Sequence, residues 1–180
     1  MTHIIIGITG GIACYKMAHV VSRLIQSDCQ VTVAMTDAAA RFVSPLTFQS
    51  LSGRPILTSI WESADPGDPQ HIRLARSAQA MLIAPATMNI IARLVHGFAD
   101  DVVSLIASAI NRSTTPVLIA PSMNATMLAQ PATQRNLAQL EDDGYTVIAP
   151  DSGWQACRTE GPGRLPEPDA LVEAVLEAIA

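Results

Sequence analysis

The chain has 180 residues, of which 49% are hydrophobic, 15% charged and 4% aromatic, and its formal net charge is −5. This length fits a single domain over residues 1–180 with one sizeable core. The acidic balance, without any basic block, excludes a nucleic-acid partner, and no apolar run is long enough to span a membrane. So few charges also imply that part of the surface is covered, for which a homo-oligomer is the natural explanation.

The N-terminus and the cysteines indicate a cytoplasmic protein without a metal site. The opening residues MTHIIIGITGG lack a basic n-region and a cleavage site, so we expect no signal peptide. Cys14, Cys29 and Cys157 are an odd number at wide spacing, which matches neither a zinc site nor a disulfide framework. The apolar surroundings of Cys14 and Cys29 are typical of small core residues.

Strands and helices are predicted to alternate along the chain. The expected strands are residues 3–8, 30–35, 79–84, 117–120 and 145–149. The expected helices are residues 12–27, 38–42, 45–52, 89–111 (which Gly97 could break), 131–142 and a last one capped by Asp169. This alternation predicts an α/β fold with a doubly wound parallel sheet, Rossmann or flavodoxin-like and three-layered. The loops after Ile8, Met35, Ala84 and Ala120 then share one edge, where we expect the site.

Two of these loops could hold a phosphate. Gly10 and Gly11 lie between a strand and a helix, where backbone N–H groups and the helix dipole favour an anion, although a tight turn without a ligand is the alternative. The spacing is neither the dinucleotide fingerprint nor a Walker loop, so a mononucleotide fits better than NAD. Thr36 could contact a phosphate or ribityl chain, or simply cap the next helix.

Two neighbouring strands end in the same pattern of an apolar run, Ala-Pro, a polar residue and then Asn. The first is IAPATMN, in which Thr87 and Asn89 could bond to a flat heterocycle. The second is VLIAPSMNATM, in which Asn124 could donate to a carboxylate, or only cap a helix. Because this pattern occurs twice, capping alone is a weaker explanation.

Two further segments contain titratable side chains beside loops. His71 follows the turn-rich ADPGDP loop and could act as acid or base, or be a surface histidine. Residues 151–168 are too rich in Gly and Pro for helix or strand and predict a flexible flap. Cys157 near its tip could donate a proton, with the adjacent Arg158 favouring the thiolate, or the segment could be a connector with an incidental thiol.

Together these residues resemble the homo-oligomeric flavin-containing cysteine decarboxylases, and most closely the bacterial branch that acts on 4'-phosphopantothenoylcysteine in coenzyme A synthesis. The matching pieces are GITGGIACYK, MTDAAARFV, HIRLAR, APATMNIIARLVHGFADD, APSMNATM and ACRTEGPGRLPEP. They cover nearly the whole chain. The Pro-x-Met-Asn-x-x-Met segment and the cysteine flap are the specific ones.

The resemblance implies an FMN-dependent carboxy-lyase that converts 4'-phosphopantothenoylcysteine to 4'-phosphopantetheine. In the family, oxidation of the carbon that bears sulfur gives a thioaldehyde, loss of CO₂ gives an enethiolate, and reduction and protonation complete the product. The FMN-binding positions are Gly10, Gly11, Ile12, Thr36, Phe42, Thr87, Met88, Asn89, Ile90 and Ser122. The catalytic positions are His71, Asn124 and Cys157, and the substrate is contacted by Asn124 and Met127.

The same resemblance implies a homotrimer or a dodecamer of trimers with flavin between subunits, and a separate ligase partner enzyme. Arg158 departs from the family's glycine after the flap cysteine, and Thr159 from its common acidic residue. Three alternatives stay open: a peptidyl-cysteine oxidative decarboxylase, a flavin prenyltransferase and a non-catalytic regulatory flavoprotein. The flap cysteine argues against the first, and the His and Pro-x-Met-Asn pattern against the second.

Overall fold

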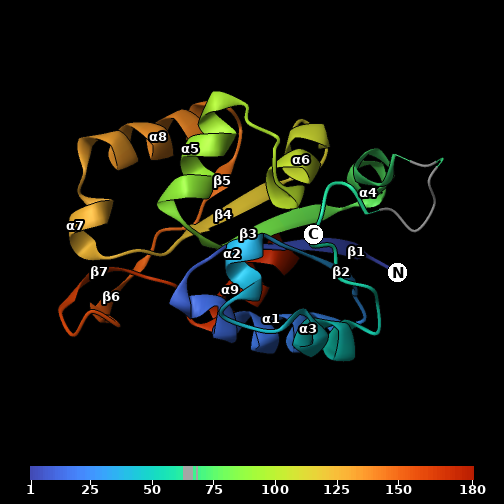
Figure 1. Ribbon diagram of the computed structural model, residues 1–180, viewed down its shortest axis with the longest axis horizontal. Helices are drawn as coiled ribbons and strands as arrows, with labels where there is room; N and C mark the ends of the chain where they lie inside the picture. The colour runs from blue at the N-terminus through green and yellow to red at the C-terminus, as the bar shows by residue number, and fades with distance from the viewer. Residues whose placement is uncertain (63–66, 68) are drawn as a thin grey trace.

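A five-stranded parallel sheet forms the centre of the molecule (Figure 1). The computed structural model describes residues 1–62, 67 and 69–180. The strands are β1 (His3–Ile8), β2 (Gln30–Met35), β3 (Ala80–Ala86), β4 (Val117–Pro121) and β5 (Thr146–Val147). Their order across the sheet is β2-β1-β3-β4-β5, which is the flavodoxin-like order. The predicted fold class is therefore confirmed.

Helices cover both faces of this sheet (Figure 1). On one face lie η1 (Ile12–Tyr15), α1 (Lys16–Gln26), α3 (Pro45–Ser52) and α9 (Pro168–Glu177). On the other lie α4 (Gln70–Ser77), α5 (Met88–His96), α6 (Val102–Ala109) and α8 (Pro131–Asp142). Two short helices, α2 (Asp37–Ala40) and α7 (Ala125–Leu128), follow the carboxyl ends of β2 and β4. The arrangement has three layers, as predicted.

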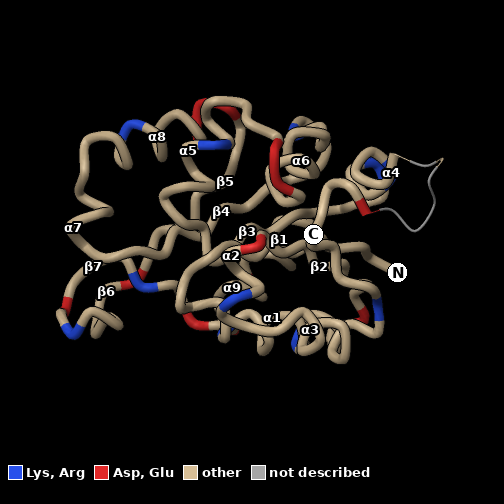
Figure 2. The backbone as a smooth tube through the Cα atoms, viewed as in Figure 1, with Lys and Arg blue, Asp and Glu red and all other residues tan. Residues whose placement is uncertain are grey.

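The core is split by the sheet into two apolar clusters. Ile4, Ile6 and Ile8 of β1 face one cluster, whereas Ile5 faces the other. β1 and β3 are buried along their whole length, as expected for parallel strands covered on both faces. No strand of the parallel sheet contains a charged residue, and Figure 2 shows the charges on the surrounding helices and loops. Cys14 and Cys29 are buried, which confirms that they are core residues.

The predicted flap was wrong in one respect, because part of it is a β-hairpin. β6 (Asp151–Trp154) pairs antiparallel with β7 (Glu160–Arg164). Gly153 and Gly163 adopt φ values of +150° and +116°, which L side chains rarely adopt, so here glycine makes the hairpin's backbone possible rather than preventing a strand. We call residues 151–164 the flap hairpin.

Other predicted boundaries shifted for local reasons. The predicted helix over 89–111 is two helices, because Gly97 ends α5 with φ +71° and Asp101 caps α6. Asp169 is not the cap of the last helix: α9 begins one residue earlier, with Glu167 at the cap position and Pro168 at its first turn, where proline fits well. β3 continues through Pro85 to Ala86, and β4 extends to Pro121. Most of the ADPGDP loop lies outside the described residues.

Candidate active site

The carboxyl ends of β1 and β3 meet where the strand order reverses, which is the usual ligand site of such sheets. Thr9 joins the two ends after β1: its Oγ1 donates to the Pro85 carbonyl at 2.5 Å and accepts from the Thr87 backbone N–H at 3.1 Å. Thr87 in turn caps α5, since its side chain accepts from the Ile90 N–H. The loops that follow both strands are thereby held together at this edge.

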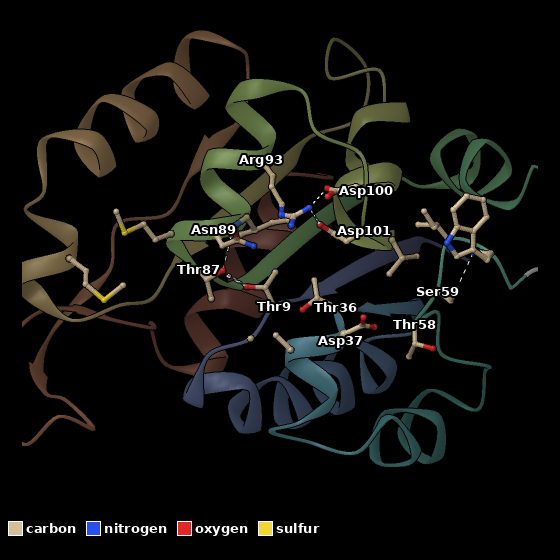
Figure 3. Close-up of a pocket in the computed structure, with 18 residues that line it drawn as sticks. Thr9, Thr36, Asp37, Thr58, Ser59, Thr87, Asn89, Arg93, Asp100 and Asp101 are labelled. Carbon is tan, nitrogen blue, oxygen red and sulfur yellow. Dashed lines mark hydrogen bonds and ion pairs between the residues drawn. The ribbon is translucent and has the colours of Figure 1, made fainter.

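A cavity of about 840 Å³ opens at this edge, and we call it the rim pocket (Figure 3). Hydroxyl and amide groups line it from four segments of the chain: Thr9, Thr36, Thr58, Ser59, Thr87 and Asn89. Apolar side chains also line it, among them Ile60, Trp61, Met88, Ile90, Val102 and Met127. Such a mixture of hydrogen-bonding groups and apolar surface suits a flat heterocycle with a polar tail.

The charged groups of the rim pocket are mostly paired with one another. Arg93 bonds to Asp100 and lies 3.7 Å from Asp101 (Figure 3). Asp101 also caps α6, accepting from the Val103 and Ser104 N–H groups at 2.9 Å. Because two carboxylates already neutralise Arg93, we expect a phosphate here to depend on hydroxyl and backbone donors.

Gly10 brings the first loop against α2. A Cβ at Gly10 would lie 2.4 Å from the Cβ of Ala38, whereas a Cβ at Gly11 would meet nothing closer than 3.6 Å. The Gly11 N–H donates to the Thr9 carbonyl at 2.8 Å, so it is not a free phosphate donor. Thr36 caps α2 by accepting from the Ala39 N–H at 3.2 Å, which leaves its own O–H available for a ligand.

A second cavity of about 660 Å³ adjoins the first, and we call it the flap pocket. It lies between the Gly10–Ile12 turn, the end of β4 and the flap hairpin, and it includes Ser122, Asn124 and Cys157. Both cavities share Gly10, Thr87, Met88 and Met127. A ligand in the rim pocket would therefore border a ligand in the flap pocket.

Asn124 serves two purposes in the flap pocket. Its Oδ1 accepts from the Thr126 N–H at 2.8 Å and caps α7. Its Nδ2 donates to the Cys157 sulfur at 3.0 Å and to Gln155 Oε1 at 3.4 Å. Capping and a role in the pocket are thus compatible, because each uses a different end of the amide.

Cys157 is exposed, and its pKa lies below the ordinary thiol value because Thr159 and Asn124 hydrogen-bond to its sulfur. The Thr159 Oγ1 and the Cys157 sulfur are 3.0 Å apart. Arg158 is not among the causes of this shift, so its predicted effect on the thiolate stays a prediction. Arg158 has φ +64°, a conformation that favours glycine, which explains the glycine expected at this position.

Two predicted site residues lie outside both cavities of a single chain. His71 is on α4, which Figure 1 draws at the opposite end of the molecule from the flap hairpin. Phe42 follows α2 and is about half exposed. The remaining predicted positions, from Gly10 to Cys157, line one cavity or both.

The sequence interpretation missed several lining residues. Thr58, Ser59 and Trp61 reach the rim pocket because Leu57 forms an isolated bridge to Ala34, which no local pattern predicts. Gln155 could have been noticed from its position two residues before Cys157.

Among the described residues, no group of three or more His, Cys, Asp or Glu side chains is placed to hold a metal ion. No described helix is long and apolar enough to cross a membrane.

The family model described as Flavoprotein matches residues 1–180, so the chain belongs to the Flavoprotein family. It is also similar to the coenzyme A biosynthesis bifunctional protein CoaBC of Bacillus subtilis, with 42% identity over 95% of this chain and 41% of the relative. The Escherichia coli protein of the same name is 42% identical over 94% of this chain and 41% of the relative. The chain thus spans about two fifths of the length of these relatives.

Solved structures with this fold include cysteine decarboxylases. The FMN-dependent cysteine decarboxylase SpaF superposes with a TM-score of 0.83 and 30% identity, over 100% of this chain and 98% of that one. A PPC decarboxylase variant complexed with pantothenoylaminoethenethiol superposes with a TM-score of 0.86 and 26% identity, over 98% and 97%. The similarity to these solved structures therefore agrees with the family match.

Proposed function

We propose that this protein is an FMN-dependent decarboxylase that converts 4'-phosphopantothenoylcysteine to 4'-phosphopantetheine in coenzyme A biosynthesis. The single observation that carries the proposal is the Asn124–Cys157 contact of 3.0 Å in a cavity that adjoins the rim pocket. It places a side-chain amide, which would donate to a carboxylate, next to a thiol and beside a space suited to a flavin. The similarity to CoaBC over nearly the whole chain supports this substrate.

The rim pocket fits FMN. Gly10 allows the close approach of two loops, Thr36 keeps a free O–H, and Met88 and Ile90 supply apolar surface. Gly11, Ile12, Phe42, Thr87, Asn89 and Ser122 complete the proposed cofactor set. When bound, FMN supplies the oxidation and later reduction of the substrate, which no side chain of the chain can perform.

The chain's own residues would bind the substrate and handle its protons. Asn124 would donate an N–H to the substrate carboxylate, and Met127 would cover the substrate from α7, since both line the flap pocket. Cys157 would protonate the product, because a thiol whose pKa is lowered gives up its proton more readily. His71 would deprotonate the substrate thiol.

His71 is on α4, at the opposite end of the molecule from α7, which Asn124 caps (Figure 1), so we propose that a second copy completes the site. In a homotrimer or a dodecamer of trimers, α4 of one subunit would approach the flap pocket of its neighbour. Exposed apolar residues such as Phe98 and Phe42 provide surface that such contacts would cover. We further propose that residues 1–180 act as one decarboxylase domain in the cytoplasm, with the preceding ligation supplied by another domain or enzyme.

Anaerobic incubation with 4'-phosphopantothenoylcysteine tests the function. We expect release of CO₂ and 4'-phosphopantetheine without lasting loss of the flavin's absorbance. A lasting enethiol product would instead indicate oxidative decarboxylation of a peptide-like substrate. No reaction from a flavin-loaded protein would favour the regulatory alternative, and a colourless protein that takes up no FMN would contradict the proposal altogether.

A further inference from the structure

Gln155 is a buried polar side chain to which the function above assigns no role. It lies in the flap hairpin, is only 7% exposed and is close to both Asn124 and Cys157. We propose that Gln155 is a positioning residue that fixes the side-chain amide of Asn124, so that one Asn124 N–H faces the Cys157 sulfur and the flap pocket.

The orientation of the Gln155 amide follows from its partner on the hairpin. Its Nε2 is 2.7 Å from the carbonyl oxygen of Pro162, and a carbonyl can only accept. The NH₂ end of the amide must therefore face Pro162. The Oε1 end then faces the α7 side, where the Ala125 N–H at 3.3 Å and Asn124 Nδ2 at 3.4 Å donate to it. From the hairpin itself, Thr159 Oγ1 at 3.5 Å and the Cys157 sulfur at 3.6 Å also donate to it, at longer range.

The orientation of the Asn124 amide follows in the same way. Its Oδ1 accepts from the Thr126 backbone N–H at 2.8 Å, a group that can only donate. The NH₂ end therefore faces the flap hairpin, where one hydrogen bonds to Gln155 Oε1 and the other to the Cys157 sulfur. Thr126 and Gln155 thus hold the amide from opposite ends, and the N–H toward the sulfur has a fixed direction.

This arrangement has a consequence that rests on the proposed function. Asn124 has only two amide hydrogens, and both have acceptors in this structure. A substrate carboxylate would take the hydrogen that now contacts sulfur, while Gln155 keeps the other. The sulfur then loses a donor, so Cys157 retains its proton until the carboxylate has left as CO₂.

Hydrogen bonds, rather than charges, govern the thiol in this structure. Arg158 and Glu160 lie at the exposed tip of the hairpin, and Arg164 on β7 is bonded to Glu167. The lowered pKa of Cys157 comes from Thr159 and Asn124, without a contribution from these charged groups. The pH dependence of Cys157 reactivity therefore reports on the Thr159 contact and on the orientation of Asn124.

The test is the rate of Cys157 alkylation by iodoacetamide against pH in the full chain as purified, followed on the Cys157 peptide by mass spectrometry. Gln155→Met keeps the side-chain volume but removes the acceptor. We expect its rate at pH 7 to fall roughly three- to tenfold, as for loss of one hydrogen bond, and its midpoint to move to higher pH. Gln139→Met, at an exposed glutamine of α8, should leave the profile unchanged.

Double variants of Gln155 and Asn124 distinguish a positioning role of Gln155 from a general loss of structure. Asn124→Ser keeps a capping oxygen but removes the amide donor, so it should slow alkylation when Gln155 is present. In the Gln155→Met background, Asn124→Ser should cause no further decrease in the alkylation rate. In the Gln155→Glu background, which retains the acceptor, Asn124→Ser should cause its full decrease. If Gln155→Met does not fold, the Gln155→Glu pair decides alone. The proposal would be overturned if Asn124→Ser slowed alkylation equally in the unchanged protein and in the Gln155→Met background. It would also be overturned if Asn124→Ser had no effect in the Gln155→Glu background.

These measurements use no substrate, so they are independent of whether the protein decarboxylates 4'-phosphopantothenoylcysteine. Cys14 and Cys29 are buried, so the exposed Cys157 dominates the reaction with the reagent. Failure of the decarboxylation assay with a normal alkylation result would reject the proposed function and leave the role of Gln155 intact. The reverse result would reject only the role of Gln155.

Discussion

Cys157 is hydrogen-bonded both within its own hairpin and to the loop after β4. Thr159 is two residues away in sequence, but Asn124 comes from a segment 33 residues earlier. Neither partner carries a formal charge. The thiol is therefore tuned by the way two loops meet, and changing single side chains should separate their effects.

The first prediction concerns the protonation step. Cys157→Ser removes the acidic thiol but keeps a small polar group, so CO₂ release should continue while the product stays at the enethiol stage. The similar PPC decarboxylase variant was solved in complex with pantothenoylaminoethenethiol, whose name is that of an enethiol. Mass spectrometry of the small-molecule product is the measurement, and fully reduced 4'-phosphopantetheine from Cys157→Ser would remove the thiol from the proposed mechanism.

The second prediction concerns the pKa of Cys157. Thr159→Val removes the hydrogen bond that lowers the pKa of Cys157 most, so the pKa should rise and the thiolate fraction at neutral pH should fall. The pH profile of iodoacetamide reaction should accordingly move to higher pH. Thr47→Val, at an exposed position of α3, is the control and should leave the profile unchanged. An unshifted profile for Thr159→Val would mean that Asn124 alone tunes the thiol.

At the scale of elements, the site depends on close contact between the turn after β1 and the start of α2. Gly10 and Ala38 approach so closely that only glycine fits at position 10. The turn and helix α2 follow neighbouring strands, and both line the rim pocket. Their separation therefore affects both stability and the proposed FMN site.

The third prediction tests this contact. Gly10→Ala should lower the free energy of unfolding by about 1–3 kcal/mol, as for an overpacked core, and weaken FMN retention. Gly11→Ala is the matched control for the unfolding measurement, since its Cβ would meet only ordinary contacts. Ala38→Gly removes the atom that Gly10→Ala would strike, so the double variant should recover FMN retention. Thermal unfolding and flavin absorbance measure both effects.

At the scale of the whole molecule, the proposed catalytic groups lie at two distant ends. His71 on α4 is far from the flap hairpin, whereas Asn124 and Cys157 are in direct contact (Figure 1). A site made by one chain would leave His71 without a role. The proposed assembly of copies would unite them.

The fourth prediction is complementation between two inactive variants. His71→Asn and Asn124→Asp should each abolish CO₂ release while retaining FMN. When the two are coexpressed in equal amounts, about a quarter of the shared sites should have both natural residues, and this share of the activity should return. Restored activity is the expected result; a mixture as inactive as its parents would place both residues in the same subunit's site.

The fifth prediction concerns stability and pH. Burial lowers the pKa of His3 below 6.5, and its ring bonds to Thr32 at 2.8 Å and to Ser77 at 3.0 Å. As pH falls below about 6.5, the unfolded chain binds a proton that the folded chain binds only at lower pH. The free energy of unfolding should therefore decrease, by at most about 1.4 kcal/mol per pH unit from this group. In His3→Gln, the free energy of unfolding measured with denaturant should depend less on pH. In His96→Gln, at an exposed position, its pH dependence should be the same as in the unchanged protein.

The elements whose signal is local could be predicted from the sequence. β1 and β2 have the predicted bounds because each is a largely apolar segment rich in β-branched residues that ends just before a polar residue. Gly10, Thr36 and Asn124 could be proposed as site residues because each follows a strand end, and parallel strands bring such ends to one edge. The flap hairpin was not predicted, because its glycines mark backbone conformations that are recognisable only once two strands pair.

Apolar periodicity and strand-end chemistry, both short-range properties of the chain, were sufficient to determine the parallel α/β architecture and the edge on which a ligand would bind. The tertiary structure alone decided how the side chains there are connected. Gln155 bonds to Asn124 across 31 residues, and the Thr58–Trp61 segment enters the rim pocket through one isolated bridge. These contacts depend on how separate loops pack against one another, and no local pattern encodes that packing.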